Sequence, residues 1–203
     1  MHILLIGLNH KTASVELREQ LAIADVSLQN ALKKLREMKS ILECVVVSTC
    51  NRMELYVVCD QLHTGEYYAK TFLEDWTQSK KDNFAPHLYI KQNMEAVRHL
   101  FQVVCGLDSL ILGETQILGQ IRNAFLFAQS SGTTGTISNR LFRQAITLGK
   151  YVHANTRIGK HPVSISYAAV ELAKKRFSSL QDKTVLLIGA GKMSELAAKH
   201  FLS

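Results

Sequence analysis

Cys50 stands in a setting that suits nucleophilic chemistry. It lies in a short polar break between two runs of β-favouring residues, so we expect its thiol in the loop that joins two strands. Arg52 follows two residues later, and a cation beside an exposed thiol favours the nucleophilic thiolate. Thr49 and Asn51 can hydrogen-bond a carbonyl oxygen, and a guanidinium can grip a carboxylate. The pattern predicts covalent catalysis on an acyl substrate that carries an acid group.

A structural interpretation of the same residues stays open. Free cysteine is most often a small buried hydrophobe. Cys50 would then pack inside the hairpin, and Arg52 and Glu54 would form a surface ion pair.

Alternating strands and helices are expected to hold this loop in place. The sequence predicts strands at 2–7, 44–48, 55–59 and 88–90. It predicts a helix at 15–21 that Ser14 caps, a second helix that Ser27 caps and a third helix at 65–76, and it predicts a charged loop at 79–85. This order predicts an α+β fold with helices on one face of a mainly antiparallel sheet. The order β-α-β-β-α-β is ferredoxin-like.

Additional helices follow the predicted sheet. In a helix over 94–105, capped by Asn93, an apolar stripe of Val97, Leu100, Phe101 and Val104 leaves His99 on the opposite side. His99 is therefore expected at the surface, either solvated or available for proton transfer.

Two further helices are predicted at 113–129 and at 138–156, the second capped by Ser138. Gln116 and Gln120 project from one face of the first, with Asn123 beside them. These amides either meet water or hold polar groups of a substrate. We place a domain boundary near His161-Pro162, and a helix opened by Ser164 or Ser166 is expected to run to Phe177.

The last segment has the pattern of a dinucleotide fingerprint. An apolar run at 184–188 precedes Gly-x-Gly-x-x-Ser at 189–194 and a helix-prone stretch, which is the strand-turn-helix context that the fingerprint requires. Glycines allow the backbone to approach a pyrophosphate at the helix N-terminus.

Composition and charge limit the classes of protein to which the chain can belong. The 203 residues carry a net charge of +7, and 140–203 hold 11 Lys and Arg against 3 Asp and Glu. A basic stretch of this kind attracts polyanions such as an RNA backbone, or it forms solvated helix faces. No apolar run suits a membrane span or signal peptide. The four cysteines fit neither a zinc site nor a disulfide scaffold, so we expect a cytoplasmic protein with reduced thiols and no metal.

Four motifs, in this order, resemble the glutamyl-tRNA reductase family. They are GLNHKTA at 7–13, STCNRME at 48–54, GLDSLILGETQILGQ at 106–120 and GAGKMS at 189–194. The resemblance implies NADPH-dependent reduction of glutamyl-tRNA(Glu) to glutamate-1-semialdehyde through a Cys50 thioester. This reaction begins tetrapyrrole (porphyrin and haem) biosynthesis.

The resemblance also implies roles for individual residues. Cys50 and His99 are the expected catalytic residues. Substrate binding is expected of Thr49, Cys50, Asn51, Arg52, Ser109, Glu114, Thr115, Gln116 and Gln120, and NADPH binding of Gly189, Ala190, Gly191, Lys192, Met193 and Ser194. Within this set, Glu114 is expected to hold the ammonium of the glutamyl group and Arg52 its side-chain carboxylate.

Proteins of the family continue beyond Ser203, so we expect an amino-terminal fragment. It would comprise a catalytic, glutamyl-tRNA-binding domain at 1–158 and, at 159–203, a linker helix with the first strand-turn-helix of a Rossmann-type NADP-binding domain. Such a fragment is expected to retain only acyl transfer or esterase activity and to bind NADPH poorly. The full-length protein is expected to be a homodimer that also contacts glutamate-1-semialdehyde aminomutase. A Cys-dependent acyl hydrolase or transferase, and a non-catalytic tRNA-binding module, remain alternatives.

Overall fold

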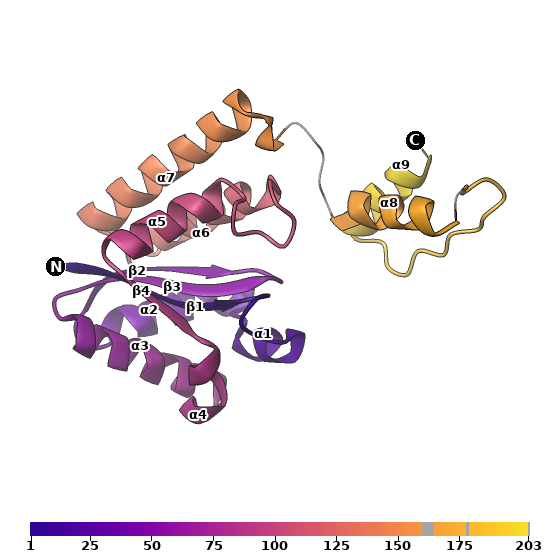
Figure 1. Ribbon diagram of the computed structural model, residues 1–203. Helices are drawn as coiled ribbons and strands as arrows, with labels where there is room; N and C mark the ends of the chain where they lie inside the picture. Colours follow the sequence, from indigo (N-terminus) through magenta and orange to yellow (C-terminus); the bar gives the residue numbers. More distant parts are fainter. Residues whose placement is uncertain (160–164, 178, 203) are drawn as a thin grey trace.

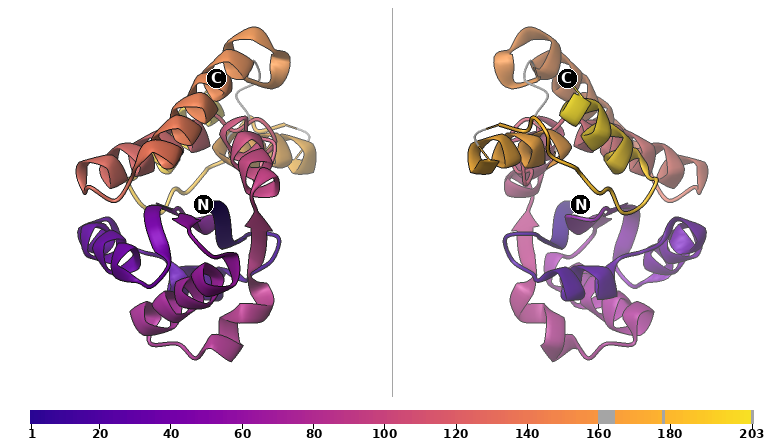
Figure 2. Two further views of the ribbon diagram at one scale, coloured as in Figure 1. Left: turned by 90° about the vertical axis from the view of Figure 1, so that its left-hand side faces the viewer. Right: turned by 90° about the vertical axis from the view of Figure 1, so that its right-hand side faces the viewer.

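The computed structural model describes residues 1–159, 165–177 and 179–202. An antiparallel sheet with helices on both of its faces forms the amino-terminal part of the chain (Figures 1 and 2). Its strands are β1 (His2–Asn9), β2 (Ile41–Ser48), β3 (Arg52–Cys59) and β4 (Tyr89–Gln92). They lie in the order β2-β3-β1-β4, and all neighbours are antiparallel.

The first group of helices covers one face, as the sequence predicts. It comprises α1 (Val15–Leu21), α2 (Asp25–Glu37) and α3 (Leu62–Thr77). The predicted Ser14 cap is confirmed, because its Oγ accepts a hydrogen bond from the Leu17 amide at 3.4 Å. The predicted Ser27 cap is wrong: Ser27 lies inside α2, and its hydroxyl donates to the Ala24 carbonyl.

The polar segment expected as a loop at 79–85 is largely helical. It forms α4 (Lys81–Phe84) and the 3-10 turn η1 (Ala85–His87). Phe84 is fully buried, and this apolar contact orders a segment whose charges favoured a loop.

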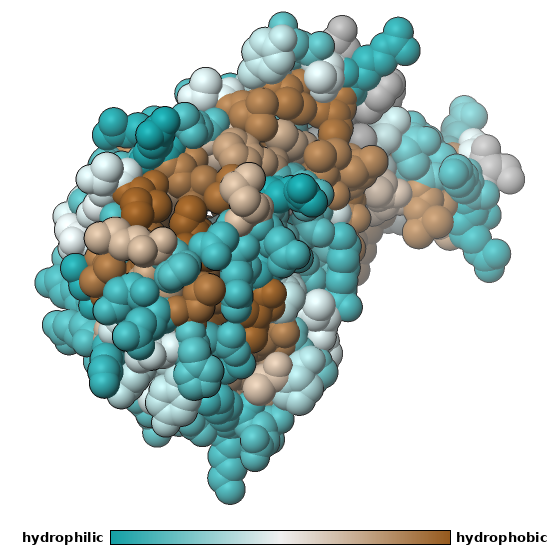
Figure 3. All heavy atoms as spheres, turned by 60° about the vertical axis from the view of Figure 1, so that its left-hand side comes forward, coloured by the Kyte–Doolittle hydropathy of each residue, from teal (hydrophilic) through white to brown (hydrophobic). Residues whose placement is uncertain are grey.

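Three more helices cover the opposite face, which the prediction of a one-sided sheet missed. They are α5 (Met94–Val104), α6 (Gln116–Ser130) and α7 (Thr136–Asn155), followed by the short turn η2 (Arg157–Gly159). The upper half of Figure 3, where α5 and α7 lie, shows apolar patches among polar atoms.

The caps of these helices differ from the predicted ones. The Asn93 side chain accepts from the Ile3 amide instead of capping α5. Ser138 lies in the first turn of α7, where the Glu43 carboxylate of β2 accepts from the amides of Ile137 and Ser138 at 3.2 and 2.7 Å. An acid on a neighbouring strand therefore supplies the cap that Ser138 was expected to supply.

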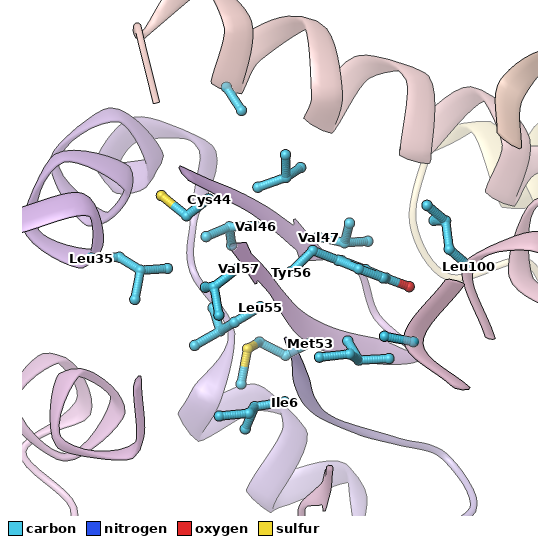
Figure 4. Packing of buried hydrophobic residues seen from close by; sticks show 14 of the residues in the cluster. Ile6, Leu35, Cys44, Val46, Val47, Met53, Leu55, Tyr56, Val57 and Leu100 are labelled. Atoms are coloured by element: carbon cyan, nitrogen blue, oxygen red, sulfur yellow. The ribbon is translucent and has the colours of Figure 1, made fainter. Parts of the chain in front are cut away.

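The side chains of each strand alternate between two apolar layers. Figure 4 shows Leu35 of α2 near Cys44 on one side of the sheet, and Tyr56 with Leu100 of α5 on the other. The Tyr56 ring also meets Phe142 of α7 edge-on at 5.4 Å. Both faces of the sheet are thus closed to water, and its ends remain available for a site.

The C-terminal segment is a separate helix pair, α8 (Ile165–Phe177) and α9 (Lys192–Leu202), which contact each other. The strand predicted at 184–188 is not formed, because no other described segment pairs with it and its apolar side chains stay exposed. The predicted hinge at His161-Pro162 and the Ser164 cap lie outside the described residues. Ser166 lies within α8 and is buried.

Candidate active site

A tight turn between β2 and β3 presents Cys50 to solvent. The Thr49 amide donates to the Arg52 carbonyl at 2.8 Å, and the Thr49 hydroxyl accepts from the amides of Asn51 and Arg52. Arg18 of α1 donates from Nε to the Cys50 carbonyl at 3.2 Å. Cys50 is exposed and unpaired as a thiol. The interpretation in which Cys50 packs inside the hairpin is therefore wrong.

A second loop closes over this turn. It connects α5 to α6, and Gly106 and Gly113 have φ values of 73° and 83°, a conformation that glycine adopts without steric cost. The Gly113 amide donates to the Gly106 carbonyl at 2.9 Å. This closure brings the segment containing Ser109 and Glu114 towards Cys50.

The two loops and the start of α6 enclose a pocket of about 110 Å³. We call it the thiol pocket. Its lining residues are Thr49, Cys50, Asn51, Arg52, Ser109, Leu110, Glu114, Gln116, Ile117 and Gln120. The structure thus gathers every residue predicted to bind substrate except Thr115, which is exposed just before α6. Burial raises the pKa of Glu114 above its usual value.

Arg52 lines the thiol pocket, but its donors are already engaged. Nη1 donates to Oε1 of Glu54 at 2.8 Å, and Nη2 donates to the carbonyl of Asp108 at 2.6 Å and to its Oδ2 at 3.3 Å. Burial would lower the pKa of Arg52, but the charge of Glu54, together with Tyr89, Tyr56 and Asp108, outweighs burial and raises that pKa. The predicted surface pair of Arg52 and Glu54 is thus a buried ion pair, with both side chains at most 2% exposed.

Glu54 accepts hydrogen bonds from four side chains. Besides Arg52, they are the hydroxyls of Tyr56 and Tyr89, at 2.9 and 2.5 Å, and Nε2 of His99 at 2.7 Å. Burial would raise the pKa of Glu54, but the His99 hydrogen bond and the Arg52 charge bring it down to about 2. Glu54 is therefore a buried, ionised anchor for the β3 end of the site.

His99 lies on the buried face of α5, and the prediction of a surface His99 is wrong. The buried residues of α5 include Ala96, Leu100 and Val103, whereas Phe101 of the predicted stripe is only half-buried. The apolar stripe was assigned one position out of register, because Glu54 supplies the polar partner that allows a histidine to face the sheet. His99 does not line the thiol pocket.

Sequence reasoning missed the residues that connect these loops. Nζ of Lys11 donates to Oδ1 of Asp108 at 2.6 Å, and Nδ2 of Asn9 donates to its Oδ2 at 3.1 Å. Gly7 pairs with Glu54, and a Cβ at Gly7 would lie 2.8 Å from Cγ of Glu54. The signal was present: Gly7, Asn9 and Lys11 all belong to the motif at 7–13, to which no role was given.

The turn at 189–194 fits a nucleotide only in part. Gly189 has a φ of 101°, and a Cβ at Gly191 would meet nothing within 4 Å, so the backbone before α9 is open to a phosphate group. A dinucleotide crevice also requires neighbouring parallel strands. Among the described residues, no strand lies beside 184–188.

An exposed cysteine in a small pocket at the end of an antiparallel sheet defines a candidate site for thiol chemistry. Residues 6–156 match the family model for the Glutamyl-tRNAGlu reductase, N-terminal domain, and residues 171–203 match that for Shikimate / quinate 5-dehydrogenase. The chain belongs to the glutamyl-tRNA reductase family.

Comparison with individual relatives supports membership of this family. The chain is 62% identical over 203 residues to a glutamyl-tRNA reductase of Halalkalibacterium halodurans and 55% identical over 200 residues to that of Bacillus subtilis. It spans 44% of the length of each. A solved structure of the glutamyl-tRNA reductase from Methanopyrus kandleri is similar with a TM-score of 0.69 and 36% identity, over 98% of this chain and 46% of that one.

None of the helices that the structure describes is both long enough and apolar enough to cross a bilayer.

Proposed function

We propose that this chain is the part of an NADPH-dependent glutamyl-tRNA reductase that binds the charged tRNA and receives its glutamyl group. The observation that carries the proposal is the exposed thiol of Cys50 in a pocket lined by Thr49, Ser109 and Glu114. The relatives named glutamyl-tRNA reductase supply the substrate class.

In the proposed reaction, Cys50 Sγ attacks the ester carbonyl that joins glutamate to the RNA. A C–S bond forms, the C–O ester bond breaks, and the RNA leaves as a hydroxyl that takes up a proton. Hydroxyl and amide groups of Thr49 and Gln116 are suited to orient the carbonyl. Residues 189–194 would hold the pyrophosphate of NADPH, which would supply the hydride for reduction of the thioester to glutamate-1-semialdehyde, with the C–S bond broken and the Cys50 thiol released.

Glu114 and Arg52 divide the recognition of the glutamyl group in this proposal. The Glu114 carboxylate pairs with the ammonium. For Arg52 to bind the side-chain carboxylate, that carboxylate must replace Asp108, because the guanidinium is otherwise engaged by Glu54 and Asp108. Asp108 keeps Lys11 as a partner when it is displaced.

The role proposed for His99 is to position Arg52. Nε2 of His99 reaches Oε1 of Glu54, and the same oxygen accepts from Arg52. A change at His99 is therefore transmitted to the thiol pocket through two hydrogen bonds, without contact between the imidazole and the substrate.

The architecture supports a matching division of the chain. The order of strands and helices and the sheet order β2-β3-β1-β4 support a ferredoxin-like catalytic domain at 1–158. The segment 159–203 would begin a Rossmann-type domain. We propose that the whole protein is cytoplasmic and dimeric and passes its aldehyde to the aminomutase.

Product analysis of the full-length protein with glutamyl-tRNA tests this function. A reductase forms the aldehyde only when NADPH is present. A Cys-dependent hydrolase or transferase forms glutamate or an acyl product at the same rate without NADPH, and a tRNA-binding module leaves the ester intact. Either of the last two results would refute the proposed reduction.

A further inference from the structure

The carboxylate of Asp108 lies between the two terminal nitrogens of the Arg52 guanidinium. Its Oδ2 accepts from Nη1 and from Nη2, at 3.3 Å each. This is the position in which a guanidinium binds the carboxylate of a ligand. Arg52 lines the thiol pocket, and so does Ser109, the residue after Asp108. Asp108 therefore places a carboxylate of the protein where the carboxylate of a glutamyl group is proposed to bind.

Both terminal nitrogens of Arg52 are fully engaged within the described part of the chain. Each carries a pair of N–H groups. Nη1 donates to Glu54 at 2.8 Å, and Nη2 donates to the Asp108 carbonyl at 2.6 Å. The remaining N–H of each nitrogen donates to Oδ2 of Asp108, and these two contacts are the longest of the four, at 3.3 Å. They are therefore the contacts that give way when a second carboxylate enters.

Lys11 offers the Asp108 carboxylate a partner away from Arg52. Its Nζ donates to Oδ1 at 2.6 Å, and its side chain is 55% exposed, against 2% for Arg52. Burial would raise the pKa of Asp108, but the Lys11 hydrogen bond and the charges of Arg52, Lys11 and His99 outweigh it and lower that pKa. A displaced Asp108 thus stays ionised and keeps a cation beside it at the surface.

The loop that carries Asp108 is also held by main-chain contacts. Nη2 of Arg52 donates to the Asp108 carbonyl, and the Gly113 amide donates to the Gly106 carbonyl at 2.9 Å. Neither bond involves the Asp108 carboxylate. The side chain can therefore move, or lose its charge, while the loop stays closed over the Cys50 turn.

We propose that Asp108 is an internal competitor for the carboxylate of the substrate and that Lys11 is the counter-ion that receives Asp108 when it is displaced. In the empty pocket, Asp108 compensates the buried charge of Arg52. When an acidic acyl group binds, its carboxylate replaces Oδ2 and Asp108 turns towards Lys11. Occupation of the site by Asp108 lowers the apparent affinity for the acyl group. Neither Asp108 nor Lys11 lines the thiol pocket, so both act on substrate affinity through Arg52.

The inference rests on the proposed function, and binding of charged tRNA to the Cys50→Ser chain tests it, because that replacement leaves the ester intact. Dissociation constants are measured for one tRNA that carries glutamate, the same tRNA that carries glutamine, and the uncharged tRNA. Glutamine has nearly the shape of glutamate without its charge, so the ratio of the first two constants reports the carboxylate. Asp108→Asn should tighten binding of glutamyl-tRNA about tenfold relative to the other two.

Lys11→Met should have the opposite effect on this ratio. Without Lys11, Asp108 keeps Arg52 as its only cationic hydrogen-bond partner among the described residues, so it is harder to displace and the preference for glutamyl-tRNA falls. In the Asp108→Asn background, Lys11→Met should leave the preference unchanged, because no carboxylate remains to be received. A role of Lys11 in binding the substrate directly would lower the preference in both backgrounds and would overturn its assignment as counter-ion.

Asp60→Asn is the matched control. It makes the same replacement at an exposed position just beyond the opposite end of β3, where Asp60 accepts a hydrogen bond from Ser40, and it should leave the ratio unchanged. Circular dichroism confirms that each variant is folded. A weaker or unchanged relative affinity of Asp108→Asn for glutamyl-tRNA would overturn the inference and leave Asp108 a structural role. Equal affinity for all three tRNAs in every variant would instead refute recognition of the glutamyl group, and with it the proposed function.

Discussion

Arg52 and Glu54, two residues apart on β3, form an ion pair that is buried at the end of the sheet. Nη1 of Arg52 lies 2.8 Å from Oε1 of Glu54, and the same guanidinium reaches across to Asp108 in the loop after α5. The pair therefore ties the Cys50 turn to the loop that closes the thiol pocket.

Glu54→Gln should destabilise the domain by about 3–5 kcal/mol, because removing one partner leaves a buried charge poorly compensated. Urea denaturation measures the loss. The control is Glu66→Gln, which removes the partly exposed pair of Glu66 with Lys70 within α3 and should cost at most about 0.5 kcal/mol. A similar loss of unfolding free energy in both variants would show that the buried ion pair stabilises the protein no more than the partly exposed one.

Acid should destabilise the protein over the pH range in which the Glu54 carboxylate becomes protonated. Its pKa is about 2 in the folded protein against 4.5 ordinarily, so its stabilising contribution is complete above pH 4.5. This contribution is lost as pH falls towards 2, with a slope of up to about 1.4 kcal/mol per pH unit. Urea midpoints measured across the window should fall less steeply for Glu54→Gln than for the unaltered chain. Identical slopes would contradict an ionised Glu54.

Iodoacetamide at neutral pH should modify Cys50 selectively. Cys44, Cys59 and Cys105 are buried, and burial raises the pKa of Cys44 to about 12 and also raises those of Cys59 and Cys105. Peptide mass spectrometry should find the label on Cys50 first, and Cys50→Ser should abolish the fast phase. Uniform, slow labelling of all four thiols would support a structural cysteine.

Gly7→Ala should disturb the site through Glu54. The added Cβ would lie 2.7 Å from the Met53 carbonyl and 2.8 Å from Cγ of Glu54, and overpacking of this kind costs about 1–3 kcal/mol. The midpoint temperature of thermal unfolding and the rate of acyl transfer should both fall. In the control, Gly119→Ala, the Cβ meets nothing within 4 Å, and the helix should gain about 0.5–1 kcal/mol. Equal changes in unfolding midpoint and acyl transfer for Gly7→Ala and Gly119→Ala would show that the added Cβ at Gly7 does not clash with Glu54.

The sequence predicted what depends on local pattern and missed what depends on contacts between distant residues. Two β-favouring runs around a polar break placed Cys50 in its turn. The Glu43 cap of α7 and the Asp108 contacts of Arg52 join residues that lie far apart in the chain. His99 was misplaced for the same reason: helical periodicity treats a polar residue as exposed, and only its partner Glu54 makes burial favourable.

Capture of the glutamyl group tests the central claim most directly. The chain is mixed with tRNA that carries radiolabelled glutamate, denatured in acid and separated from RNA. Label should remain on the unaltered protein and on Cys105→Ala, be released by excess thiol, and be absent from Cys50→Ser. Label that persists in Cys50→Ser, or an unlabelled but folded wild-type protein that binds the charged tRNA, would contradict a thioester on Cys50.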